Sequence, residues 1–148
     1  MAYAFLKAQG LSVGASRVEA EGVAAAEEAL DLAKQRNVTI HLPVDHLVGK
    51  SVEVTSPIES CPTPQIPEGW MGLDIGTTTI RNYCEVVARA KTAIWNGPLG
   101  VAEIKAFSAG TRLVAEALVK GGGVSIIGGG DTAAVLEKWG WASKMTHV

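Results

Sequence analysis

The sequence has few aromatic residues, few cysteines and no excess of basic charge. Phe, Trp and Tyr make up 5% of the 148 residues, and 13 Lys and Arg stand against 15 Asp and Glu. Nucleic-acid binding is therefore not expected, because it requires a basic surface, often interleaved with aromatic residues. Cys61 and Cys84 have neither a Cys-x-x-Cys spacing nor a close histidine pair. We expect them to be the reduced thiols of a cytosolic protein rather than part of a zinc site.

Long hydrophobic runs are also absent. No stretch approaches the roughly 20 apolar residues of a membrane-spanning helix, and the N-terminus lacks the basic region and cleavage site of a signal peptide. We therefore expect no membrane association and a cytoplasmic location. Hydrophobic residues still make up 47% of the chain, which is enough for one globular α/β domain with a substantial core.

The spacing of apolar residues predicts where the regular elements lie. Helical periodicity indicates helices at 1–8, 22–36, 76–90 and 103–119. Short apolar runs indicate strands at 38–42, 92–95 and 124–127, with a short edge strand at 52–55. The proline-rich segment 57–67 is expected to be a surface loop. The first helix begins without a cap, which suggests a chain cut from a larger domain.

The strands at 92–95 and 124–127 flank the helix at 103–119. A strand–helix–strand order requires the two strands to be parallel, with a right-handed crossover. The loops that follow them then meet at the carboxyl edge of the sheet, where open α/β sheets bind ligands. We expect a three-layer α/β domain with a mainly parallel sheet.

The segment 128–132, Gly-Gly-Gly-Asp-Thr, is the most informative part of the chain. It follows an apolar run and precedes a helix-forming stretch. Glycines allow close approach to a ligand, and the N–H groups of a helix start attract phosphate. A carboxylate beside a polyphosphate needs a cation between them, so Asp131 suggests a Mg²⁺-bound nucleotide. Alternatively, Asp131 or Thr132 is an N-cap and the glycines form a plain turn. The spacing matches neither a Walker A loop nor a dinucleotide fingerprint.

A second glycine-containing loop, Asn-Gly-Pro-Leu-Gly at 96–100, follows the other strand. Asn96 can donate to a phosphate oxygen, and Glu103 just beyond the loop can accept hydrogen bonds from a ribose diol. The alternative is a turn with Glu103 in the first turn of a helix, where acids are favoured. Two such loops at one sheet edge are a stronger signal than either alone.

Three motifs together resemble phosphoglycerate kinases: Trp-Met-Gly-Leu-Asp-Ile-Gly at 70–76, Trp-Asn-Gly-Pro-Leu-Gly-Val at 95–101, and Gly-Gly-Gly-Asp-Thr at 128–132. Residues 1–6 and 42–45 are also similar to that family. The order and spacing resemble its C-terminal, nucleotide-binding domain, and the resemblance covers residues 1–148. The chain departs from the family at Thr77, where proline is common, and at Ala102, where an aromatic is common.

The resemblance implies phosphoryl transfer in glycolysis and gluconeogenesis between 1,3-bisphosphoglycerate and MgADP, giving 3-phosphoglycerate and MgATP. By the same resemblance, Asp131 faces Mg²⁺, Glu103 holds the ribose, and Asn96 lies near the phosphates. Gly72 and Leu73 border the adenine. The remaining phosphate-binding residues implied are Gly129, Gly130 and Thr132. The full-length enzyme is expected to be a monomeric, cytoplasmic protein of two hinged, Rossmann-like domains. The resemblance implies that this chain is part of one of them, a three-layer α/β domain that is incomplete at both ends.

The N-terminal domain of the family, with its phosphoglycerate site and basic catalytic residues, has no counterpart in the sequence. We therefore expect a fragment that supplies most of a nucleotide site, carries no catalytic residue and is inactive alone. Two alternatives remain: a stand-alone nucleotide-binding module without catalysis, and an inert structural α/β fragment that self-associates. Asp45 is expected to stabilise a turn, and Cys84 is expected to pack rather than react.

Overall fold

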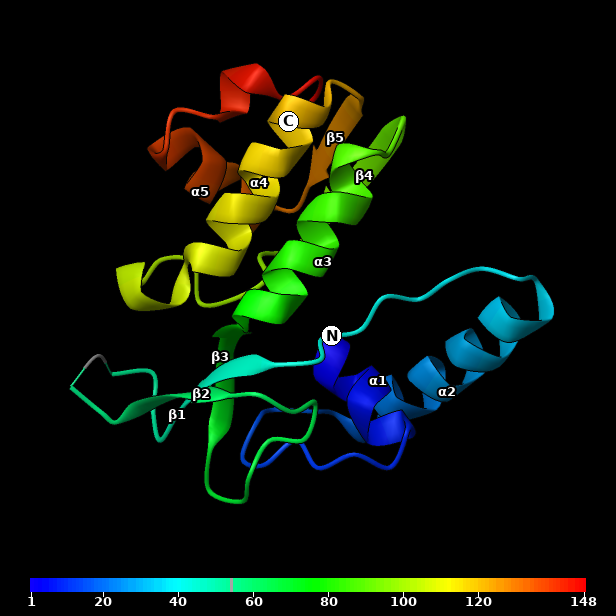
Figure 1. Ribbon diagram of the computed structural model, residues 1–148, viewed down its shortest axis with the longest axis vertical. Helices are drawn as coiled ribbons and strands as arrows, with labels where there is room; N and C mark the ends of the chain where they lie inside the picture. Colours follow the sequence, from blue (N-terminus) through cyan, green and yellow to red (C-terminus); the bar gives the residue numbers. More distant parts are fainter. Residues whose placement is uncertain (54) are drawn as a thin grey trace. The chain divides into compact units, whose positions relative to one another are not determined.

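The computed structural model describes residues 1–53 and 55–148 (Figure 1). The chain divides into two units, Met1–Thr79 and Ile80–Val148. The first unit contains α1 (Ala2–Ala8), α2 (Ala20–Gln35), β1 (His46–Gly49), β2 (Ile58–Cys61) and β3 (Met71–Ile75). Helix α3 (Thr77–Ala88) begins at the end of the first unit. The second unit continues with β4 (Thr92–Asn96), α4 (Ala109–Gly121), β5 (Val124–Gly128) and α5 (Gly130–Lys138), and has short 3₁₀ turns at Lys105–Phe107 and Ala142–Lys144.

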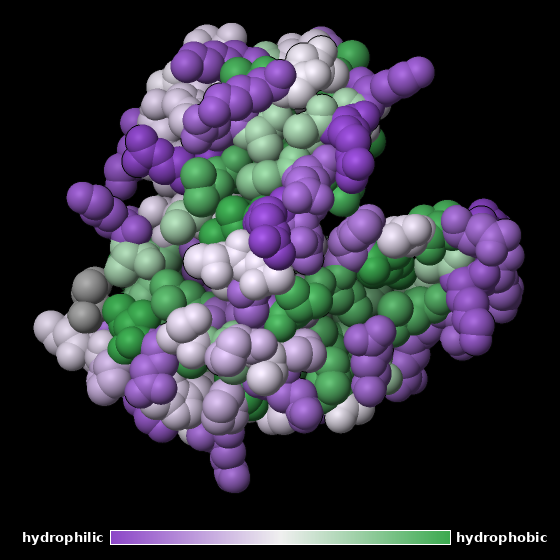
Figure 2. All heavy atoms as spheres, in the orientation of Figure 1, coloured by the Kyte–Doolittle hydropathy of each residue, from purple (hydrophilic) through white to green (hydrophobic). Residues whose placement is uncertain are grey.

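The sheet of the first unit is antiparallel, with strand order β2-β1-β3. Its core contains Val48, Cys61 and Ile66, with Tyr3 and Trp70 packed against them. Helix α1 forms as expected and buries Leu6, which is 1% exposed. Hydrophilic side chains gather over the C-terminal end of α2 (Figure 2), as expected of a helix with one solvent-facing side.

The strand expected at 38–42 is not formed, and that prediction was wrong. Residues 38–42 have no regular secondary structure, and the strand lies further along the chain at His46–Gly49. A strand persists by pairing its backbone groups with a neighbour, and β1 pairs with both β2 and β3. Val38 is 59% exposed, so burial does not favour a strand at 38–42 either.

The segment between β1 and β3 also differs from expectation. Of the edge strand expected at 52–55, Val52 and Glu53 form bends and Thr55 a turn, while residue 54 lies outside the described residues. The expected loop at 57–67 instead contains β2, which pairs with β1. Cys61 closes β2 with a buried side chain and Ile66 is also buried, so this proline-rich stretch contributes two residues to the core.

The second unit confirms the parallel pairing. β4 and β5 are parallel neighbours, with Trp95 opposite Ile127. The mixed α/β class is also confirmed, because the first unit contains an antiparallel sheet and this one contains the parallel pair β4–β5. Its core contains Ala115, Ile127, Leu136 and Met145, against which residues such as Trp139 and Trp141 pack. β4 is only partly buried, because its residues alternate between exposed and half-buried and Ile94 is 77% exposed.

The helix expected at 103–119 begins later than its apolar spacing suggests. Helix α4 begins at Ala109, and the preceding Lys105–Phe107 is a 3₁₀ turn. Phe107 lies in that turn and is fully buried. Its apolar side chain fitted the helical spacing, although the residue is not part of the helix. The C-terminal end follows expectation, because Gly122 has φ +69° and caps α4. Among helices of the described residues, none has the length and apolar character to cross a membrane.

Candidate functional site

The two glycine-containing loops leave the sheet side by side. In the parallel ladder Asn96 lies opposite Gly128, so the chain enters both loops at the same edge of the sheet. The strand–helix–strand order predicted that both loops begin at one edge of the sheet, and this prediction is confirmed. The local sequence explains the position, since β4 and β5 end where glycine and proline begin.

Thr132 joins the two loops. Its Oγ1 accepts a hydrogen bond from the N–H of Gly97 at 2.9 Å, and its side chain is fully buried. Nε1 of Trp95 donates to the carbonyl of the same Gly97 at 2.6 Å. The hydroxyl of Thr132 therefore already has a partner within the protein and fixes the geometry of the site.

The start of α5 is not capped by a side chain. Gly129 is the N-cap residue, and no side-chain cap hydrogen bond is formed there. The first intrahelical bond runs from the N–H of Ala133 to the carbonyl of Gly129, so the N–H groups of residues 130–132 precede the helical ladder. Gly129, Gly130 and Asp131 are all exposed. Neither Asp131 nor Thr132 is the N-cap, and this helix start is open to an anion.

The glycines of the loop serve different purposes. Gly129 has φ +87°, and a methyl group there would lie 2.6 Å from Oδ1 of Asn96. Gly129 is therefore required by the backbone and by the neighbouring amide. Gly130 has neither constraint, and a methyl group there would meet no atom within 4 Å. Gly130 thus faces open space beside the uncapped N–H groups.

The two acidic site residues differ in their surroundings. Asp131 lies in the first turn of α5 and is exposed. Glu103 is exposed in a turn before the Lys105–Phe107 segment, not in the first turn of a helix. No cluster of three or more His, Cys, Asp or Glu able to hold a metal occurs among the described residues. One exposed carboxylate still fits Mg²⁺, which commonly takes one or two carboxylates together with substrate phosphates and water.

Gly72 and Leu73 belong to the first unit and are positioned on β3. Leu73 is 3% exposed, so its side chain is part of the core. The N–H of Gly72 donates to Oγ of Ser16 at 3.0 Å. A methyl group at Gly72 would clash with the phenol of Tyr3, so intramolecular packing already requires a glycine there. Burial, and then the charge of Asp74, raises the pKa of Tyr3 to about 12, which keeps that phenol neutral.

Sequence reasoning underestimated Asp45. Its carboxylate accepts the N–H groups of Thr78 and Thr79, each at 2.8 Å, and the hydroxyl of Thr79 at 2.5 Å. Burial alone would raise the pKa of Asp45, but these hydrogen bonds outweigh it and the pKa is lowered. Asp45 therefore caps the start of α3 from a distant part of the chain. The separation in sequence left no local signal for this contact.

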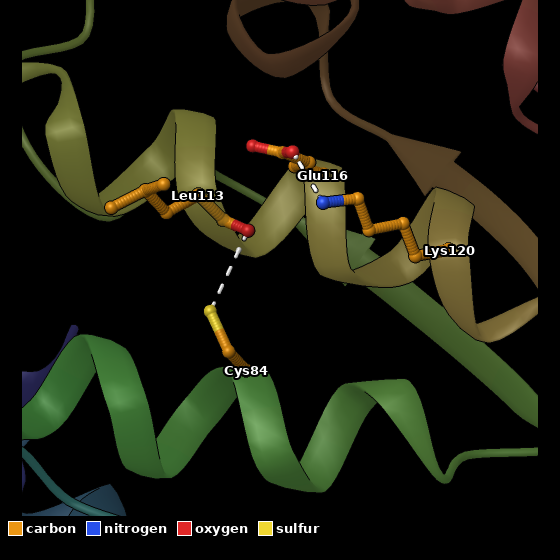
Figure 3. A network of polar contacts seen from close by, with 4 residues as sticks. All are labelled: Cys84, Leu113, Glu116 and Lys120. Carbon is orange, nitrogen blue, oxygen red and sulfur yellow. Dashed lines mark hydrogen bonds and ion pairs between the residues drawn. The ribbon is translucent and has the colours of Figure 1, made fainter.

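Cys84 packs against α4, as expected. Its Sγ donates to the carbonyl of Leu113 at 3.5 Å (Figure 3). On the same helix, Nζ of Lys120 lies 2.7 Å from Oε1 of Glu116. Burial, and then the charge of Glu116, raises the pKa of the Cys84 thiol. A raised pKa lowers the fraction of reactive thiolate, which favours the packing role expected of Cys84.

Comparison with known proteins identifies the family. The family model described as phosphoglycerate kinase matches residues 1–148. A phosphoglycerate kinase from Clostridium novyi is 47% identical over 148 residues, and one from Pseudothermotoga lettingae is 46% identical over 149 residues. Among solved structures, a phosphoglycerate kinase from Coxiella burnetii is 39% identical over 99% of this chain, with a TM-score of 0.95.

The chain belongs to the phosphoglycerate kinase family. It spans 37% of the Clostridium novyi relative, 38% of the Pseudothermotoga lettingae relative and 38% of the Coxiella burnetii chain. It therefore corresponds to a little over a third of those kinases.

Proposed function

We propose that residues 1–148 supply most of the nucleotide site in the C-terminal domain of a phosphoglycerate kinase. That enzyme transfers a phosphoryl group between 1,3-bisphosphoglycerate and MgADP, giving 3-phosphoglycerate and MgATP. The observation that carries the proposal is the uncapped start of α5, where exposed Gly130 and Asp131 stand beside the loop after β4. Because the chain belongs to a kinase family, we take the anion bound at this helix start to be the phosphate of a nucleotide.

Each candidate residue has a role that its surroundings allow. The N–H groups of residues 130–132 and the side chain of Asn96 bind phosphate oxygens. Asp131 holds Mg²⁺, which neutralises phosphate charge when bound. Glu103 accepts hydrogen bonds from the ribose, and Gly72 with Leu73 borders the adenine. Phosphoryl transfer depends mainly on such positioning and charge neutralisation.

The remaining requirements of turnover lie outside this sequence. The acyl phosphate needs a site and basic residues that the family places in its N-terminal domain. We therefore propose that this chain binds MgADP but is inactive alone, and that the complete enzyme is a cytoplasmic monomer. The proposal as a whole rests on the family resemblance together with the open helix start.

The first experiment compares nucleotide binding with and without metal. Asp131→Asn should weaken MgADP binding by about tenfold, equivalent to about 1.4 kcal/mol, while changing metal-free ADP binding much less. Asp31→Asn, an exposed aspartate of α2, is the control and should change neither. Equal losses of MgADP and ADP affinity in the Asp131 variant would contradict the metal role.

A second experiment tests the ribose assignment. Glu103→Ala should weaken ADP binding by a few-fold, because a hydrogen bond contributes about 0.5–1.5 kcal/mol. Inorganic pyrophosphate has no ribose, so its affinity should stay unchanged. Glu103 is exposed in a turn, and the variant should keep its stability. Unchanged ADP affinity would show that Glu103 does not contact the nucleotide.

One observation favours an alternative, an inert fragment that self-associates. Ile94 is 77% exposed on β4, and an exposed apolar residue on a strand is a site for association. Ile94→Lys should abolish any concentration-dependent assembly in analytical ultracentrifugation. Assembly without MgADP affinity would favour the inert fragment, whereas MgADP binding by a monomer would favour the nucleotide site.

A further inference from the structure

Thr111 contacts the loop after β4 from the first turn of α4. Its Oγ1 accepts a hydrogen bond from the N–H of Leu99 at 3.0 Å, and its side chain is fully buried. Twelve residues separate the two partners, so no local pattern in the sequence indicates the contact. A buried hydroxyl that accepts a loop N–H is costly to remove, because the N–H then loses its partner.

The loop is held at two points by the same chemistry. Thr132 on α5 accepts the N–H of Gly97 at 2.9 Å, and Thr111 on α4 accepts that of Leu99. Pro98 lies between them and has no N–H to donate. The backbone donors of residues 97–99 are therefore turned toward the two helices. They are not the groups that contact a phosphate.

This arrangement gives the loop a positioning role. The loop connects Asn96, whose Oδ1 would lie 2.6 Å from a methyl group at Gly129, with the turn that carries Glu103. Releasing Leu99 would free both flanking side chains to move. We propose that Thr111 is a positioning residue of the nucleotide site, which fixes the loop at 97–100 so that Asn96 and Glu103 meet the nucleotide together. The inference rests on the function proposed above.

The experiment compares two substitutions of the same side chain. Thr111→Val keeps the shape but removes the hydroxyl, whereas Thr111→Ser keeps the hydroxyl. Thr111→Val should weaken MgADP binding by about tenfold and accelerate hydrogen exchange at the N–H of Leu99 without nucleotide. Thr111→Ser should restore both properties to within a few-fold of the unsubstituted chain.

A control with the same chemistry, at the exposed Thr146, separates positioning from the general loss of a threonine hydroxyl. Oγ1 of Thr146 accepts the N–H of Ser125 at 3.1 Å, near the start of β5 and so at the opposite end of that strand from the glycine loop. Thr146→Val should lower thermal stability but leave MgADP affinity and Leu99 exchange unchanged. A loss of affinity equal to that of Thr111→Val would show that any lost hydroxyl in this unit has the same effect.

The outcomes distinguish this inference from the proposed function. Normal MgADP binding by Thr111→Val, with faster exchange at Leu99, would overturn the role of Thr111 and leave the nucleotide site standing. If Thr111→Val does not fold, Thr111→Ser decides, because a strong loss of affinity with the hydroxyl retained would also overturn it. Absence of MgADP binding by the unsubstituted chain would remove the proposed function and the inference together.

Discussion

Two strand-to-helix junctions of this chain look alike in sequence but are completed differently. The first runs from β3 through Gly76 into α3, and the second from β5 through Gly129 into α5. At the first, the carboxylate of Asp45 already occupies the helix start and accepts the N–H groups of Thr78 and Thr79. At the second, no side chain caps the helix.

The difference indicates which junction is available to a ligand. A helix start attracts negative charge through its free N–H groups and its dipole. The carboxylate of Asp45 binds the free N–H groups of α3, whereas α5 carries Asp131 in its first turn but has no side chain bonded to its free N–H groups. Gly76 is also closed, because a methyl group there would clash with the carboxylate of Asp45. The contrast suggests a different role for each junction. The first stabilises the fold, and the second is the one at which we propose that phosphate binds.

The largest expected effect comes from exchanging one aspartate at each junction. Asp45→Asn should lower the free energy of unfolding by about 2–3 kcal/mol, because it removes the charge from buried hydrogen bonds. Asp131→Asn should change it by less than about 0.5 kcal/mol, since the side chain is exposed. Denaturant unfolding followed by circular dichroism measures both. Similar losses of stability in the two variants would break the comparison.

The two glycines of the second junction should also differ in what their substitution changes, one lowering stability and the other lowering nucleotide affinity. Gly129→Ala should destabilise the protein by about 1–2 kcal/mol, because a non-glycine residue is strained at its positive φ. Gly130→Ala should leave stability within about 1 kcal/mol yet weaken MgADP binding, since its methyl group would enter the space beside the free N–H groups. Thermal melting and isothermal titration of both variants test this. Full nucleotide affinity in Gly130→Ala would argue against close phosphate approach there.

A smaller effect is expected from acid. The pKa of Asp45 is lowered from its ordinary value of 3.8, so its carboxylate stabilises the folded state above that pH. This contribution should be lost as the pH falls through 3.8 and toward the lower folded pKa. Between a pH of about 6 and about 3, the free energy of unfolding should therefore fall more steeply with decreasing pH in the unsubstituted chain than in Asp45→Asn. Equal pH dependence would mean that Asp45 is not ionised in its contact with α3.

The second unit was the easier one to predict from the sequence. A strand–helix–strand order forces parallel pairing, so the meeting of the loops after β4 and β5 at one sheet edge follows from topology. The failed strand at 38–42 has the apolar alternation of a strand, but pairing partners decide strands and local pattern does not reveal them. The helix expected at 103–119 was started too early, at Glu103, for a related reason. The buried Phe107 was counted as part of that helix, but it belongs to a 3₁₀ turn.

The long-range contacts could not be predicted at all. Asp45 reaches α3 across 33 residues, and Thr111 reaches Leu99 from the next helix. Both contacts join a polar side chain to backbone N–H groups. Nearly every residue has such a group, so the sequence does not indicate which one a side chain will bind. Gly72 was predicted for a ligand, and the structure adds a second reason for it in the clash with Tyr3. Such contacts depend on the completed fold and not on the spacing of residue types.

The most direct test of the account is residue-resolved hydrogen exchange at both helix starts, with and without MgADP. The account predicts that the N–H groups of residues 130–132 exchange fast in the free chain and become protected when MgADP binds. The N–H groups of Thr78 and Thr79 should be protected in both conditions, because Asp45 already holds them. MgADP binding that leaves residues 130–132 unprotected would contradict the claim that α5 receives the phosphates.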